Sequence, residues 1–242
     1  MRYLVSISYD GSRYCGWQKQ AKGVSIQGLC EEVLEKIVGA SITLNASGRT
    51  DAGVSAICQT AHFDCDVKLD KSFVGHANAL LPDDIKILEI KQVPSDFHAR
   101  YDVKQKTYKY RFYLSKQPIP FYDRFATQIK SNVDMRVFED NLKSLLGTHD
   151  FSAFCASNTS VVDKIRTIFE AKVVGDGVLY EFTISGDGFL YNMVRIIVGT
   201  LIDIASGKLS LNMAEIISSK SRANAGKTLS GKGLTLYKVS YC

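Results

Sequence analysis

Residues 167–185 read TIFEAKVVGDGVLYEFTIS, and this stretch decides the fold class of the chain. Two strand-like runs, Thr167 to Val174 and Val178 to Ser185, flank the triplet Gly175-Asp176-Gly177. Gly and Asp tolerate the positive φ angles that tight hairpin turns require. The two runs are therefore predicted to pair as antiparallel strands.

The segments around this hairpin alternate between strand and helix patterns. Apolar residues at every second position predict a strand that contains Tyr108, Tyr110, Phe112 and Leu114. Helical spacing predicts an amphipathic helix that starts at Asp134 and stops at Gly147, with a buried face of Met135, Phe138, Leu142, Leu145 and Leu146. Downstream we predict an almost wholly apolar helix, a second helix and a final strand, over residues 189–205, 213–219 and 234–241.

The first half of the chain follows a similar order of elements. A strand is predicted from Tyr3 to Tyr9 and a helix capped by Ser25, and later segments predict strands near 42–46, 57–63 and 85–93 and a short helix before Pro82. The expected fold is α+β. Two similar halves, residues 1–103 and 104–242, would bring antiparallel sheets together around a central basic cleft, with helices on the outer faces.

Composition restricts the class of protein. The chain has 242 residues, 45% of them hydrophobic and 23% charged, which is typical of a folded globule and excludes a disordered chain. A net charge of +5 is compatible with a polyanionic partner but does not establish one. Basic residues either form a binding surface or are simply solvated, and they gather at Lys104, Lys106, Lys109 and Arg111, at Lys220, Arg222 and Lys227, and at Arg13, Lys19 and Lys22.

Several kinds of site and location are not expected. No Cys-x-x-Cys pair and no His at zinc-ligand spacing occur among Cys15, Cys30, Cys58, Cys65, Cys155 and Cys242, so no metal site is predicted. The first residues lack the apolar stretch of a signal peptide, which favours the cytoplasm. The apolar segment 189–205 is interrupted by Asn192, Arg195 and Asp203, and we do not expect it to span a membrane.

One carboxylate lies on a glycine-flanked turn between two strand-like runs, in the segment Gly48-Arg49-Thr50-Asp51-Ala52-Gly53-Val54. Glycines and small side chains allow a bulky ligand to approach closely, so Asp51 is expected at the floor of a cleft. The alternative is a surface turn whose charges only face water. Arg49 and the low polarity of the flanking residues favour the first interpretation.

This segment resembles the active-site segment of the tRNA pseudouridine synthase A family, unbroken from Gly48 to Val54. Residues 186–195, GDGFLYNMVR, and the run Phe97-His98-Ala99-Arg100, followed by Tyr108, are similar to two further family segments. Residues 149–154, HDFSAF, also follow the family pattern. The C-terminal residues 230–236, SGKGLTL, depart from it, since relatives commonly carry a proline before this strand.

The resemblance implies that Asp51 is catalytic, that Arg195 pairs with it and that Tyr108 stacks on the base. From the residues alone, an arginine on an apolar helix needs an anion, and Asp51, Asp187 or Asp203 could supply it unless Arg195 reaches the surface. Tyr108 alone would be assigned to the core, because an aromatic residue on an alternating strand usually packs there. Leu190 and Arg49 complete the candidate substrate-binding residues.

Converting uridine to pseudouridine breaks the bond from N1 to C1′ and remakes it at C5, without redox change, so no cofactor is expected. Asp51 would attack C1′, attack C6 or remove a proton from C2′, and these routes stay open. The target base must leave the RNA stack, and Arg49 would take its place. The resemblance implies uridines 38 to 40 of the tRNA anticodon arm as substrates and a homodimer as the active form.

Two other functions fit parts of the sequence. A noncatalytic, sheet-based RNA-binding protein would explain the aromatic strand around Tyr108 but not the Asp51 turn. A glycoside hydrolase needs two carboxylates across one bond, and no second acid recurs near a comparable turn.

Overall fold

The computed structural model describes residues 1–70, 72–156 and 161–241, which form two α+β units. The first contains Met1–Lys104 and the chain from Thr235 onward, and the second contains Gln105–Leu234. The α+β class expected from the sequence is confirmed. The boundary between residues 103 and 104, and the cleft between the halves, stay predictions.

The first unit is built on a sheet with the strand order β4-β1-β3-β10. β1 (Arg2–Tyr9) pairs antiparallel with β3 (Ser55–Asp64) and with β4 (Ile85–Val93), and the short β2 (Asn45–Ala46) also pairs with β3. The last strand, β10 (Leu234–Ser240), runs parallel to β3. Apolar residues that alternate along β1 point into the core, as the period-2 pattern predicts.

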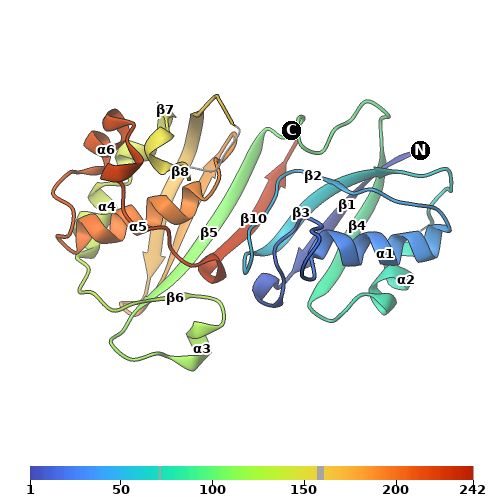
Figure 1. Cartoon of the computed structure of the whole chain (residues 1–242), viewed down its shortest axis with the longest axis horizontal. Helices are drawn as coiled ribbons and strands as arrows, with labels where there is room; N and C mark the ends of the chain where they lie inside the picture. Colours follow the sequence, from blue (N-terminus) through green and yellow to red (C-terminus); the bar gives the residue numbers. More distant parts are fainter. Residues whose placement is uncertain (71, 157–160, 242) are drawn as a thin grey trace. The chain divides into compact units, whose positions relative to one another are not determined.

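Two helices cover this sheet. α1 (Ile26–Val38) runs along the face of the sheet with α2 (Phe73–Leu80) beside it (Figure 1). The Ser25 side chain accepts a hydrogen bond from the Gly28 N–H, which caps α1 as predicted, and Gly39 ends the helix at a φ of 75°. A one-turn 3-10 helix, η1 (Gly11–Arg13), follows β1.

Replacement of Ser25 by Ala is expected to lower the free energy of unfolding by about 1 kcal/mol, because the Gly28 N–H loses its capping partner at the start of α1. Urea denaturation measures the change. Ser218, which is exposed on α6 (Met213–Ser219), is the control, and its Ala variant should lose no stability. An equal loss in both variants would mean that capping does not stabilise α1.

The second unit has a sheet with the strand order β5-β9-β8-β7. β8 (Ile165–Gly175) and β9 (Leu179–Gly186) form the predicted antiparallel hairpin. In its turn, the Asp176 carboxylate accepts hydrogen bonds from the Val178 and Leu179 N–H groups, and Gly177 has a φ of 96°. β5 (Gln105–Leu114) pairs antiparallel with β9, β7 (Gly147–Asp150) pairs antiparallel with β8, and β6 (Thr127–Ile129) runs parallel to β5.

Helices again cover one sheet face. α5 (Met193–Ala205) lies along the sheet, with α4 (Met135–Asp140) and α6 beside it (Figure 1). The remaining elements are the short α3 (Pro120–Asp123) and four 3-10 turns, η2 (Lys143–Leu145), η3 (Ser152–Phe154), η4 (Arg222–Asn224) and η5 (Gly231–Gly233). No helix within the described part of the chain is long and apolar enough to cross a bilayer. The cytoplasmic location stays a prediction.

The structure corrects three element boundaries. The apolar helix predicted from residue 189 begins at Met193, because Asn192 takes a left-handed φ of 62° that helical residues do not adopt. The helix predicted up to Leu146 ends at Asp140 and continues as the separate turn η2, which leaves Leu146 exposed. Of the strand predicted at 42–46, only Asn45–Ala46 pairs with a neighbour.

Candidate active site

Asp51 lies on a tight turn between β2 and β3. Its carbonyl oxygen accepts a hydrogen bond from the Val54 N–H at 3.1 Å, and Gly53 supplies the φ of 77° inside the turn. Thr50 and Val54 on either side are buried, whereas Asp51 is half-buried and Arg49 is exposed. The turn thus anchors Thr50 and Val54 in the core and leaves Asp51 partly and Arg49 largely exposed to solvent.

The loop that follows β1 fixes this turn. The Trp17 N–H donates to the Thr50 carbonyl oxygen at 3.0 Å, and the Tyr9 hydroxyl lies 2.8 Å from Thr50 Oγ1. The loop makes its closest approach at Gly11, where an added Cβ would lie 1.9 Å from the Val54 carbonyl oxygen. A buried position for Trp17, packed on the Tyr9 ring, was not part of the sequence prediction.

A buried polar pair holds the residues that enter the turn. Ser47 Oγ donates to Gln59 Oε1 at 2.8 Å, and Gln59 Nε2 donates to the Gly48 carbonyl oxygen at 2.9 Å. Ser47 and Gln59 are both fully buried, so these bonds are shielded from water, and leaving one of their polar groups without a partner costs about 1–3 kcal/mol. The turn is therefore held on its β2 side as well as on its loop side.

Arg195 lies in the first turn of α5. Its Nε donates to the Leu229 carbonyl oxygen at 2.7 Å, and its Nη1 donates to Oδ1 of Asn192, the residue that starts the helix. The side chain is half-buried. The two other candidate acids are engaged elsewhere, since Asp187 accepts the Thr167 N–H and Asp203 pairs with Lys208.

Tyr108 and Leu190 belong to the same unit as Arg195. The Tyr108 ring is buried on β5 and meets the edge of the Phe189 ring at a centroid distance of 5.0 Å. Leu190 is buried too, and its carbonyl oxygen accepts the Met193 N–H at the start of α5. Asp51 and Arg49 belong to the first unit. The structure thus groups Tyr108, Leu190 and Arg195 around one end of α5.

A family model described as tRNA pseudouridine synthase matches residues 5–102 and 142–242, which include Asp51 and Arg195. This chain belongs to that family. A tRNA pseudouridine synthase A from Anoxybacillus flavithermus is 42% identical over 99% of this chain and 98% of its own length. One from Shouchella clausii is 44% identical over 99% of this chain and 93% of its own. A solved chain of a Cbf5-Nop10-Gar1 complex covers 97% of this chain and 48% of its own length at 10% identity, with a TM-score of 0.41.

The C-terminal segment that departs from the family pattern is ordered without a proline. Residues 231–233 form the turn η5, and the Tyr110 hydroxyl donates to the Ser230 carbonyl oxygen at 2.8 Å. Burial raises the pKa of Tyr110, which keeps this hydroxyl protonated. An added Cβ at Gly233 would lie 2.6 Å from the Arg111 carbonyl oxygen, so only glycine fits there. Backbone packing replaces the rigidity that a proline would give.

The other family-like segment, residues 149–154, packs into the core of the second unit. Phe151 and Phe154 are fully buried, and the Asp150 carboxylate accepts hydrogen bonds from the N–H and hydroxyl of Ser152. Lys220 reaches the same carboxylate at 3.2 Å. These contacts indicate that the segment has a structural role. They also pair Lys220, one cation of the basic cluster predicted at Lys220, Arg222 and Lys227, with a protein carboxylate.

A second predicted basic cluster is partly neutralised. Glu181 on β9 lies opposite Arg111 on β5 and receives Lys109 Nζ at 2.6 Å and Arg111 Nε at 2.8 Å. Partial burial alone would raise the pKa of Glu181, but these two hydrogen bonds outweigh it and hold the pKa below its usual value. Lys109 and Arg111 are therefore bound to a protein acid.

We expect Glu181→Gln to lower the free energy of unfolding by about 1 kcal/mol at neutral pH, because two neighbouring cations lose their shared anion. Since the pKa is lower in the folded chain, this stabilisation is present above the unfolded pKa and disappears as the pH falls through the folded one. Chemical denaturation between pH 3 and pH 7 should show the two proteins converging in acid. Glu170→Gln, at the exposed pair with Lys172, is the control and should have a smaller effect. A difference that persists in acid would contradict the assignment.

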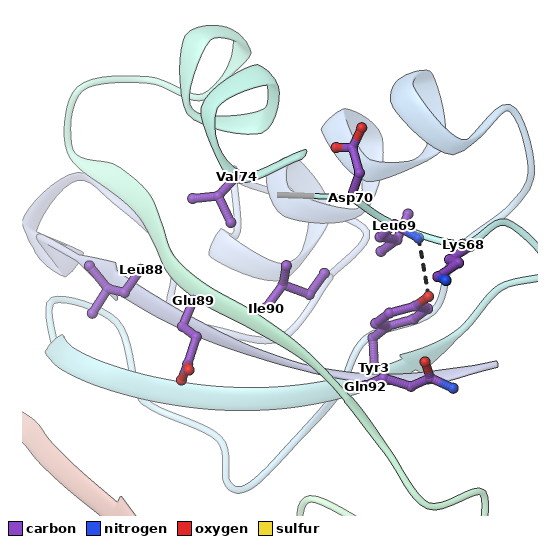
Figure 2. A pocket seen from close by; sticks show the side chains of 9 residues that line it. All are labelled: Tyr3, Lys68, Leu69, Asp70, Val74, Leu88, Glu89, Ile90 and Gln92. Carbon is purple, nitrogen blue, oxygen red and sulfur yellow. Dashed lines mark hydrogen bonds between the residues drawn. The ribbon is translucent and has the colours of Figure 1, made fainter. Parts of the chain in front are cut away.

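A concavity of about 380 Å³ lies between α2 and the edge strand β4 (Figure 2). Its described lining mixes charged and apolar side chains, and the Leu69 N–H donates to the Tyr3 hydroxyl beside it at 3.1 Å. The residues that line the concavity are Tyr3, Lys68, Leu69, Asp70, Val74, Leu88, Glu89, Ile90 and Gln92. None of them is a candidate site residue. We assign it no part in the chemistry.

No group of three or more His, Cys, Asp or Glu side chains within residues 1–70, 72–156 and 161–241 is placed to hold a metal ion. Cys242, one of the six cysteines considered above, lies outside the described residues.

Proposed function

We propose that Asp51 is the reacting carboxylate with which this chain isomerises uridine to pseudouridine in tRNA. One observation carries the proposal: in a chain of this family, the Asp51 turn is fixed on both sides by hydrogen bonds, while the acid itself is only half-buried. A group that must meet a substrate needs both a fixed position and access.

The reaction needs one carboxylate beside the sugar or the ring. Asp51 attacks C1′, attacks C6 or removes the C2′ proton, and the detached uracil must stay in place while it rotates. Uridine and pseudouridine are isomers, so the atoms balance when the N1–C1′ bond breaks, the C5–C1′ bond forms, the proton at C5 leaves and N1 gains a proton. The polypeptide's own groups can carry each of these steps.

The remaining residues have supporting roles in this proposal. Arg195 would pair with Asp51 and favour its ionised form, a role that rests on the resemblance of both segments to the family. Tyr108 would stack on the base beside Leu190, and its ring contacts that of Phe189, the residue that precedes Leu190. Arg49 is exposed next to the turn, where it would fill the place of the extruded base.

Uridines 38 to 40 of the anticodon arm are the proposed targets, and a homodimer is the proposed active form. The test is nucleotide-resolution mapping of pseudouridine in a tRNA transcript after incubation with the purified protein, together with the mass of the protein in solution. Pseudouridine within 38 to 40 is expected. Tight binding without any pseudouridine would favour a noncatalytic RNA-binding protein, and modification elsewhere would overturn the proposed positions alone.

A further inference from the structure

The turn from Phe97 to Asp102 is rigid, although it has no helix or strand. The His98 carbonyl oxygen accepts the N–H groups of Tyr101 and Asp102, at 3.1 and 3.0 Å. The Asp102 carboxylate accepts the His98 N–H at 2.7 Å, and His98 Nδ1 accepts the Arg100 N–H at 3.1 Å. Each of these bonds closes the turn on itself and reduces its conformational freedom.

Three side chains of the first unit tie this turn to the sheet. His62 Nδ1 accepts the Ala99 N–H at 3.1 Å, the Tyr241 hydroxyl donates to the Ala99 carbonyl oxygen at 2.9 Å, and Arg2 donates to the Phe97 carbonyl oxygen at 2.9 Å. Burial, then the charges of His98 and Arg2, lower the pKa of His62. The neutral ring that results is the form that can accept a hydrogen bond.

The turn presents two side chains that the fold does not bury. Tyr101 is 74% exposed, and Arg100 beside it is exposed too. The Tyr101 ring lies on the His98 ring at a centroid distance of 4.3 Å, and the Arg100 guanidinium lies 5.8 Å from the Tyr101 centroid. The ring is thus held in a fixed orientation while most of its surface remains open to a partner.

We propose that Arg100 and Tyr101 form a second RNA contact of this chain, in which the Tyr101 ring stacks on an unpaired base and Arg100 binds a phosphate. Single-stranded RNA is bound by aromatic platforms combined with cations, and a rigid platform loses little entropy on binding. The inference rests on the proposed function for its partner. The alternative occupant, an acidic protein segment, would not require the flat face of the ring.

The contact lies far from the Asp51 turn. β3 begins at Ser55, just after the turn, and reaches His62, which holds Ala99, seven residues later. At about 3.3 Å per strand residue, this separation is on the order of 20 Å. Only an extended polymer can touch both places, so the contact would distinguish a folded tRNA from a short oligonucleotide.

The test compares tRNA affinity for the wild-type protein with Tyr101→Ala, Tyr101→Phe and Arg100→Ala. We expect Tyr101→Ala to weaken binding about tenfold, and Tyr101→Phe to stay close to wild type because it keeps the ring. Arg100→Ala should reduce the slope of log affinity against log salt by about one. Under saturating tRNA, kcat should stay unchanged while KM rises in step with the loss of affinity.

Phe169→Ala and Arg136→Ala are matched controls, since both residues are exposed in the second unit. They should bind tRNA like the wild-type protein. Unchanged affinity for both Tyr101→Ala and Arg100→Ala would overturn the proposal, as would a Tyr101→Phe loss equal to that of Tyr101→Ala. These outcomes concern binding alone, so they are distinguishable from a failure of the proposed function, in which the wild-type protein forms no pseudouridine.

Discussion

Replacing Asp51 by Asn is expected to lower the rate of pseudouridine formation about 10³-fold or more while leaving tRNA affinity within a small factor of wild type. Asn has nearly the volume of Asp but neither its charge nor its basicity, so it cannot attack carbon or accept a proton. The backbone hydrogen bonds from Val54 and Trp17 that hold the turn do not depend on the carboxylate. Pseudouridine content of tRNA under single-turnover conditions measures the rate.

The matched control is Asp66→Asn, an exposed acid in the same unit, which should keep full activity. Thermal denaturation of each variant shows whether the fold is intact. If Asp51→Asn retained a rate within tenfold of wild type, another group would perform the chemistry and the role proposed for the turn would be wrong.

Gly11→Ala is expected to lower both the stability and the activity of the protein. An alanine Cβ would lie 1.9 Å from the Val54 carbonyl oxygen, so the loop and the Asp51 turn must separate. Such overpacking costs about 1–3 kcal/mol of stability. The displaced carboxylate should also lose about 10²-fold in rate, since errors near 1 Å in position have that consequence.

Gly75→Ala is the control for this substitution. Gly75 lies on α2, and an added Cβ meets nothing within 4 Å. Because Ala is a better helix former than Gly, this variant should gain about 0.5–1 kcal/mol and keep full activity. A Gly11→Ala protein with unchanged stability and activity would show that the loop does not hold the Asp51 turn.

Much of the fold follows from local sequence patterns. The Gly175-Asp176-Gly177 hairpin was predictable because the side chain of Asp176 and the positive φ of Gly177 act within a few residues. The cap at Ser25 was predictable for the same reason. The pairing of β10 with β3 was not, because alternation along a strand identifies its buried face but not its neighbour.

The first residue of α5 could not be predicted from hydrophobic periodicity. Residues 189–191 extend the apolar run of the helix toward the N-terminus, yet Asn192 takes a left-handed conformation, and its side-chain oxygen accepts a hydrogen bond from Arg195 Nη1. The hydrophobic pattern of the sequence does not indicate the positive φ angle of Asn192. Arg195 is half-buried, whereas its helix neighbours Val194 and Ile196 are buried.

The candidate site was predictable in part. Gly48, Arg49, Asp51 and Gly53 lie within one segment of seven residues, so the sequence alone marks this turn as a candidate site. The loop that supports the turn was missed, although the close approach at Gly11 and the burial of Trp17 fix the Thr50 and Val54 backbone. Contacts between residues about 40 positions apart produce no local sequence pattern. A glycine such as Gly11 is visible in the sequence, but the close backbone contact that requires it is seen only in the structure.

The most direct test of the central claim is the distance between the Asp51 carboxylate oxygens and the Arg195 guanidinium nitrogens in an experimental structure of the protein bound to tRNA. We predict a separation of about 4 Å or less, with the carboxylate facing the extruded nucleotide. A carboxylate that faces bulk solvent, out of reach of Arg195 and of the bound RNA, would contradict the account.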